Sequence, residues 1–138
     1  MKLDDVHRTY ASRRNTFVAA MERAGGGIAL IPTARESARN RDSLYPFRHD
    51  SYFYYLTGFP EPEAVLLMIA GNKDSKDAKD GKSGGPRSIL FCRDKNAEQE
   101  LWTGFRYGPE AAREKFGVET QPELLVAFGA WRLPRASP

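Results

Sequence analysis

Residues 40–68, NRDSLYPFRHDSYFYYLTGFPEPEAVLLM, decide how this chain folds. They hold seven aromatic residues, three prolines and one glycine, and they run directly into an apolar segment. Residues 51–57 are ambiguous by themselves, because their aromatic side chains favour a strand. However, Asp50 or Ser51 could cap a short helix there, and Gly58 could close it. Residues 63–70 (EAVLLMIA) are typical of a strand.

The chain on either side of this stretch contains helix and strand patterns. Residues 5–24 have apolar side chains at helical spacing, with Arg13, Arg14, Glu22 and Arg23 expected on a solvated face. The run GIALI between glycine and proline is typical of a strand buried on both faces. The further elements are a strand at 88–92, short helices at 94–102, 109–116 and 122–128, and a strand that Val118 starts.

This order of elements predicts an α/β fold with a small mixed sheet flanked by helices and an antiparallel central hairpin. Residues 71–87 contain four lysines, three aspartates and almost nothing apolar, which predicts a mobile hairpin tip. We expect one domain over residues 1–130 with its mobile loop at 71–87, and a short tail at 131–138 that has little to pack.

Composition excludes several functional classes. The net charge is +3, and no run of lysine or arginine indicates nucleic-acid binding. No segment has the apolar length of a signal peptide or of a membrane span, which requires about 18 residues. Cys92 is the only cysteine, so it forms no internal disulfide and is interpreted as a small buried hydrophobe. A reducing, cytoplasmic location is the default expectation.

The residues that could carry chemistry do not form a recognisable site. His7 and His49 lie in different elements and lack the spacing of metal ligands. Paired carboxylates could bind Mg²⁺ or Mn²⁺, but the candidates are more simply interpreted as loop, helix-cap and turn residues. Interleaved aromatic residues and arginines at 45–55 indicate core or protein interface rather than stacked bases. The four carboxylates considered are Asp42, Asp50, Glu61 and Glu63.

Several short motifs together resemble one family, the N-terminal domain of Xaa-Pro aminopeptidases (aminopeptidase P, in the creatinase/prolidase group). The resemblance extends over about residues 10–129, and it favours the short helix at 51–57. The sequence differs from the family at two positions. Tyr52 stands where an acid is usual, and His49 stands where an amide is frequent. The motifs are Arg41-Asp42-Ser43, Tyr45-Pro46-Phe47-Arg48, FYYLTGF at 53–59, Glu61-Pro62-Glu63-Ala64 and Leu101-Trp102-Thr103-Gly104.

The resemblance implies an enzyme that removes the N-terminal residue preceding proline, with two Mn ions bound by a C-terminal catalytic domain. It also implies that the last strand and helix of the present domain lie beyond Pro138, and that the catalytic domain is absent. By this resemblance the chain holds no catalytic residue and no metal ligand, and alone it is inactive.

The resemblance further implies what the domain contacts. Its partners are the catalytic domain of the same protein, other subunits of a homo-oligomer (a dimer or tetramer) and a proline-containing peptide in the parent enzyme. The domain orders the oligomer and walls the active-site mouth of a neighbouring subunit. Trp102 is the candidate substrate-pocket contact in trans, and an ordinary interface tryptophan is the equal alternative.

Two other functions remain open at this point. The chain could be a non-catalytic creatinase-like protein-interaction module, or the N-terminal domain of a prolidase or creatinase relative. A following domain that contains metal-ligand carboxylates and histidine would favour the enzyme, and one that lacks them would favour the module. A fold by itself does not determine the substrate.

Overall fold

A computed structural model of the chain describes residues 3–71 and 86–121. The helix expected at 122–128, the tail at 131–138 and most of the lysine-rich tip lie outside these residues. None of the described helices is long and apolar enough to cross a membrane. The elements are α1 Leu3–Arg23, β1 Gly27–Pro32, α2 Ser51–Thr57, β2 Val65–Ala70, β3 Arg87–Phe91, α3 Ala97–Thr103, α4 Gly108–Phe116 and β4 Glu119–Gln121.

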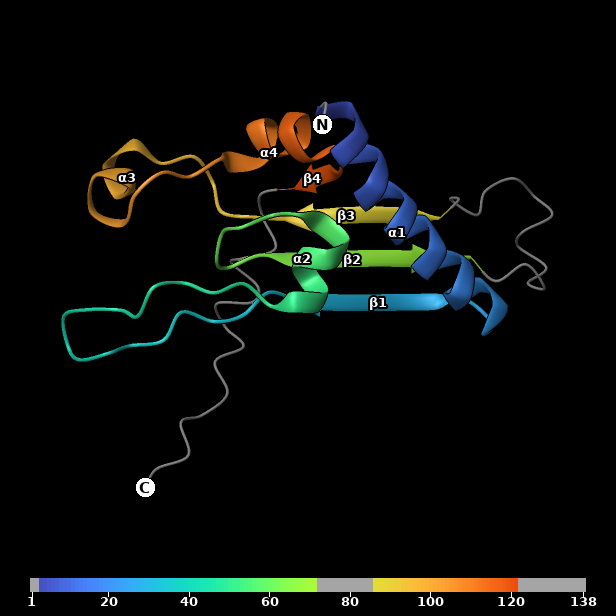
Figure 1. The fold of residues 1–138 in the computed structure, drawn as a ribbon, viewed down its shortest axis with the longest axis horizontal. Coiled ribbons are helices and arrows are strands. Elements are labelled where there is room, and N and C mark those ends of the chain that lie inside the picture. Colours follow the sequence, from blue (N-terminus) through green and yellow to red (C-terminus); the bar gives the residue numbers. More distant parts are fainter. Residues whose placement is uncertain (1–2, 72–85, 122–138) are drawn as a thin grey trace, which may run out of the picture.

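The four strands form one mixed sheet in the order β1-β2-β3-β4 (Figure 1). β2 pairs antiparallel with both β1 and β3, and β4 runs parallel to β3. In the central hairpin Val65 lies opposite Phe91 and Ile69 lies opposite Arg87. The predicted α/β class, the antiparallel hairpin and the small mixed sheet are therefore confirmed.

The core lies between the sheet and the helices on one of its faces. Side chains alternate along a strand, so Leu66, Met68 and Leu90 point toward the helical layer and are fully buried. α1 crosses the sheet diagonally, with α2 beside it (Figure 1). Burial of each large apolar side chain contributes about 1.5–3 kcal/mol. The helices and their flanks add Val18, Phe53, Leu56, Phe59, Ala112 and Phe116 to this core.

The expectation that the first strand is buried on both faces is wrong. β1 is an edge strand, hydrogen-bonded only to β2 in the described sheet. Ala29 and Ile31 pack against the core, but Ile28 and Leu30 are 69% and 53% exposed on the other face. A short apolar run has the same appearance in sequence at the centre and at the edge of a sheet, because pairing partners lie far away along the chain.

The ambiguous segment at 51–57 is helical because both of its ends are satisfied. The Asp50 carboxylate accepts a hydrogen bond of 2.9 Å from the Phe53 N–H. Gly58 has φ of 68°, and its N–H donates to the Tyr54 carbonyl. A Cβ atom at position 58 would lie 2.6 Å from the Tyr10 ring, so glycine is required there both for conformation and for space.

A buried arginine joins α1 to the other two helices of the layer. Arg14 is 4% exposed, which corrects its assignment to a solvated face. Its guanidinium donates to the Leu56 carbonyl at 2.9 Å and to the Gly117 carbonyl at 3.3 Å. Both carbonyls lie at helix C-termini, where the helix dipole favours a cation. Burial lowers the pKa of Arg14 from its usual value.

Replacing Arg14 with methionine is expected to destabilise the chain by about 2–4 kcal/mol, because two carbonyls lose a charged donor. Urea unfolding followed by circular dichroism measures the change. Arg8→Met, at an exposed position of the same helix, is the matched control and should stay within about 0.5 kcal/mol. Equal unfolding midpoints for the two variants would contradict the role of Arg14.

Candidate functional site

Residues 94–107 leave the sheet after β3 and return at α4, and we call them the α3 arm. The arm projects beyond one end of the sheet, the same end from which residues 33–50 extend (Figure 1). Asn96 caps α3 by accepting from the Gln99 N–H at 3.1 Å. The arm exposes three large apolar side chains, with exposed fractions of 84% for Leu101, 89% for Trp102 and 64% for Phe105.

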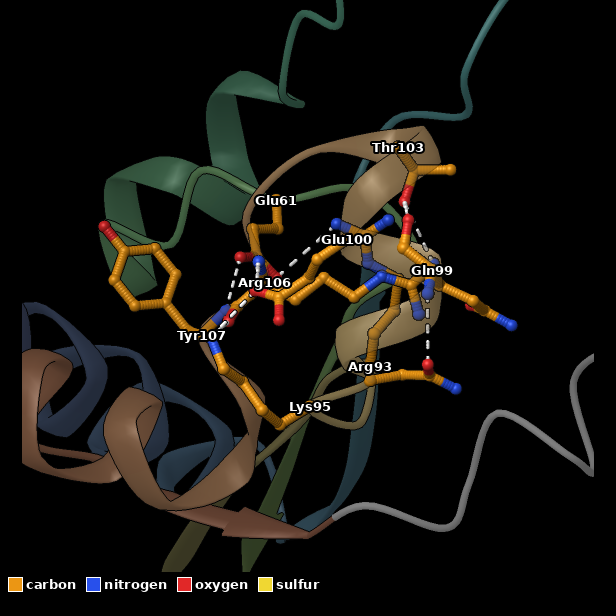
Figure 2. A network of polar contacts seen from close by, with 9 residues as sticks. Glu61, Arg93, Lys95, Gln99, Glu100, Thr103, Arg106 and Tyr107 are labelled. Carbon is orange, nitrogen blue, oxygen red and sulfur yellow. Dashed lines mark hydrogen bonds and ion pairs between the residues drawn. The ribbon is translucent and has the colours of Figure 1, made fainter.

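The base of the arm is held by a carboxylate from a distant part of the chain (Figure 2). Glu61 lies between α2 and β2 and is buried. Its Oε1 accepts from the Tyr107 N–H at 2.7 Å, and its Oε2 lies 3.6 Å from the buried Arg93 guanidinium. Arg93 directly precedes the arm and Tyr107 is its last residue, so Glu61 connects the two ends of the arm.

A second carboxylate, that of Glu100, connects the beginning and the end of the arm. Glu100 Oε1 accepts from Lys95 Nζ at 2.7 Å and from the Arg106 N–H at 2.8 Å. Lys95 Nζ also donates to the Arg106 carbonyl at 2.8 Å, which completes a ring of contacts (Figure 2). The hydrogen bond from Lys95, followed by that from the Arg106 backbone, lowers the pKa of Glu100. We call Glu61 and Glu100, with these partners, the clasp.

Aromatic rings connect the base of the arm to the core. The centroid of Phe105 lies 4.9 Å from that of Tyr107, and Tyr107 lies 5.2 Å from Phe116. Both contacts are edge-to-face, which is a favourable arrangement for aromatic pairs. Lys95 Nζ also lies 4.3 Å from the Phe105 centroid. The base of the arm is thus polar on one side and aromatic on the other.

The residues considered as metal or catalytic candidates do not converge. His7 hydrogen-bonds to the Lys115 carbonyl, and the ring of His49 stacks on Tyr54 with centroids 3.9 Å apart. Asp42 lies in an exposed loop, and Asp50 is the helix cap. Within residues 3–71 and 86–121, no three histidine, cysteine, aspartate or glutamate side chains are placed to hold a metal.

The sequence interpretation of Glu61 as a turn residue missed its buried contacts. It also missed Arg93, Lys95 and Glu100, since Lys95 and Glu100 are five positions apart and lack the three- or four-residue spacing of helical ion pairs. One usable signal was present. Glu61 lies among apolar residues and prolines, and a charged residue in such a segment needs a partner when it is buried.

Cys92 and Trp102 lie where the sequence led us to expect them. Cys92 is fully buried, and burial, with the negative charge of Glu61 as a second cause, raises its pKa to about 12. Such a thiol is a poor nucleophile, which confirms its interpretation as a small buried hydrophobe. The exposure of Trp102 is confirmed, and its contact with substrate stays a prediction.

A hollow between α1 and α2 is mostly apolar. It has a volume of about 740 Å³ and is lined by Phe17, Tyr52 and Tyr55, among others. The Arg13 guanidinium stacks over the Tyr55 ring at 4.1 Å and contributes the only charge of the lining. The lining contains no carboxylate, cysteine or histidine, so it lacks the side chains that commonly bind metals.

The structure is that of an α/β domain with a projecting arm. The α3 arm exposes Leu101, Trp102 and Phe105, and the clasp holds the arm in place. Within the part of the chain that the structure describes, no three histidine, cysteine, aspartate or glutamate side chains are placed to hold a metal. The chain belongs to the aminopeptidase P N-terminal domain family, whose model matches residues 10–124.

Relatives of known name agree with this assignment. The Xaa-Pro aminopeptidase of Escherichia coli is 42% identical over 110 residues, which are 80% of this chain and 22% of the relative. That of Haemophilus influenzae is 37% identical over 109 residues, 79% of this chain and again 22% of the relative. The chain thus spans about a fifth of the length of these proteins. The solved structure of aminopeptidase P from E. coli in its low-pH form superimposes with a TM-score of 0.69, at 38% identity, and the match covers 84% of this chain and 24% of that one.

The pH dependence of the arm follows from the lowered pKa of Glu100. The free carboxyl has an ordinary pKa of 4.5, so the contacts of Glu100 contribute fully above that pH. Their contribution is lost as the pH falls through the lowered value of the folded state. In the Trp131→Phe background, where Trp102 is the only tryptophan, its fluorescence should therefore be constant between pH 5 and 9 and should change below pH 4.5.

The matched control is Glu100→Gln, measured over the same pH range with circular dichroism to follow global unfolding. This variant should lack the part of the fluorescence change that precedes unfolding. The same transition in both proteins would show that Glu100 is not its source.

Proposed function

We propose that this chain is the non-catalytic domain of a metal-dependent Xaa-Pro aminopeptidase, which as a whole removes the N-terminal residue preceding proline. The observation that carries the proposal is the family match over residues 10–124. Two relatives with 42% and 37% identity are named for that activity. The proposal assigns the chemistry to the larger part of the relatives that this chain does not match.

The proposal places two Mn ions in the C-terminal catalytic domain of the whole protein, as the family resemblance implies. The described residues of this chain do not fit such ions, because no three potential ligands lie together among them. We therefore derive no step of the reaction through a metal in this chain. Its own contribution is to bind and to position.

The α3 arm is the part of the domain that we assign to substrate. The indole of Trp102 is 89% exposed, and a rigid aromatic surface of this kind packs well against the ring of proline or an apolar side chain. In the proposed homo-oligomer, a dimer or tetramer, the arm walls the active-site mouth of a neighbouring subunit. We also propose a cytoplasmic location, which suits a chain whose single cysteine is a buried free thiol.

The first test compares the 138-residue chain with the whole protein on an Xaa-Pro peptide in the presence of Mn²⁺. We expect release of the first residue by the whole protein only, because the described residues supply no metal site. Cleavage by the purified chain would contradict the proposal that catalysis belongs to the rest of the whole protein. An inactive whole protein would instead favour the interaction module, and a whole protein active only on Xaa-Pro dipeptides would favour the prolidase relative.

The second test replaces Trp102 with alanine in the whole protein. We expect kcat/KM for the peptide to fall about tenfold, which corresponds to about 1.4 kcal/mol of lost binding to the transition state. Tyr52→Ala removes another highly exposed aromatic side chain, 79% exposed on α2, and should leave kcat/KM unchanged. Size-exclusion chromatography of both variants separates loss of a pocket contact from loss of the oligomer.

A further inference from the structure

We propose that Glu61 and Glu100 are positioning residues, which hold Trp102 in one orientation and at one place relative to the sheet. The catalytic consequence of this inference rests on the proposed function. Its geometric part concerns this chain alone and is tested separately below.

The arm needs the clasp because the core does not order it. α3 has only seven residues, and isolated helices shorter than about 12 residues are marginal in water. None of its side chains is buried, so the core contributes little to its stability. The Phe105–Tyr107 contact lies at the base of the arm and does not reach Trp102.

Glu61 can hold the base of the arm in place because its own backbone is restrained and its side chain is buried. It follows Phe59, which is fully buried, and it lies between Pro60 and Pro62, whose rings restrict the backbone. Its contacts with Tyr107 and Arg93 are shielded from water, so salt screens them little. Hydrogen bonds that involve an ionised group are about twice as strong as neutral ones. The buried Glu61 carboxylate therefore sets the distance between the two ends of the arm.

Glu100 fixes the rotation of α3 about its own axis. Successive residues of an α-helix turn by about 100°, so positions 100 and 102 point in directions about 160° apart, on nearly opposite sides of the helix. The Glu100 side chain turns inward to Lys95 and the Arg106 N–H (Figure 2). Trp102 consequently faces outward, in agreement with its exposure. Loss of the inward contact would free the helix to roll and the indole to move with it.

Orientation matters here because a side chain delivered to another subunit cannot be adjusted by its own local surroundings. A displacement of about 1 Å at a reacting site can cost about a hundredfold in rate. A group that must act at a distance from its own domain benefits from a support whose geometry is set before binding. The clasp is such a support, with two carboxylates that act through Trp102 and touch no substrate.

The geometric test measures the motion of Trp102 by time-resolved fluorescence anisotropy in the 138-residue chain. Trp131→Phe, introduced into every protein, makes Trp102 the only tryptophan, which is excited selectively at the long-wavelength edge of the absorption band. We expect Glu100→Gln to raise the amplitude of the fast depolarisation about twofold. Glu98→Gln removes the same charge from an exposed position of the same helix and should leave that amplitude unchanged.

Lys95→Met removes the other side of the clasp and should reproduce the effect of Glu100→Gln. Glu61→Gln keeps the acceptor for Tyr107 and loses the charge beside Arg93, and its effect should equal or exceed that of Glu100→Gln. Circular dichroism verifies that each variant is folded. If Glu100→Gln and Lys95→Met both leave Trp102 as ordered as in Glu98→Gln, the inference is overturned, whatever the activity of the whole protein.

The functional test is a double-mutant cycle in the whole protein. We expect Glu100→Gln to lower kcat/KM roughly tenfold when Trp102 is present, and to have no further effect in the Trp102→Ala background. An equal loss in both backgrounds would show that Glu100 does not act through Trp102. An unchanged kcat/KM in Trp102→Ala alone would refute the substrate role of Trp102 and the catalytic half of this inference, while the anisotropy result still decides the geometric half.

Discussion

The helical layer of this domain depends on one buried guanidinium. Arg14 emerges from α1 and hydrogen-bonds to carbonyls at the ends of α2 and α4, so a single side chain sets the mutual position of three helices. Both carbonyls receive a charged donor from Arg14, and a buried carbonyl left without a donor is costly. Apolar packing brings the helices together, but it is non-directional. The arginine supplies the direction.

The arm repeats this arrangement with the opposite charge. The buried Glu61 carboxylate accepts a hydrogen bond from the Tyr107 N–H and lies beside the Arg93 guanidinium. It therefore links its own segment to residues 32 and 46 positions further along the chain. In both places a long-range polar contact joins elements that lie far apart in the sequence. Buried charges do not always add net stability, because desolvation opposes the attraction. What they specify here is geometry, since each charge has few positions in which its donors or acceptors are satisfied.

Local signals were sufficient to predict most of the fold. The apolar runs of β2 and β3 act over a few residues, and each led to the correct strand. The cap at Asp50 and the glycine at 58 left residues 51–57 ambiguous, and the family resemblance favoured the helix that the structure has. Prediction failed where the cause was distant. The exposure of β1 depends on its place in the sheet, and the burial of Arg14 depends on carbonyls 42 and 103 positions away. For the site, the motif around Trp102 was visible in the sequence, whereas the clasp combines Glu61 with residues at 93–107, more than 30 positions further along the chain.

The place of β1 at the edge of the described sheet has a consequence for the handling of this domain. Its sequence, GIALIP, carries no charge, and edge strands commonly use lysine, charged side chains or bulges to discourage pairing with other chains. Ile28 and Leu30 add exposed apolar surface on the same strand. An isolated domain with such an edge is prone to strand-to-strand association at high concentration. A lysine at position 28 would place a gatekeeper charge on that strand without entering the core.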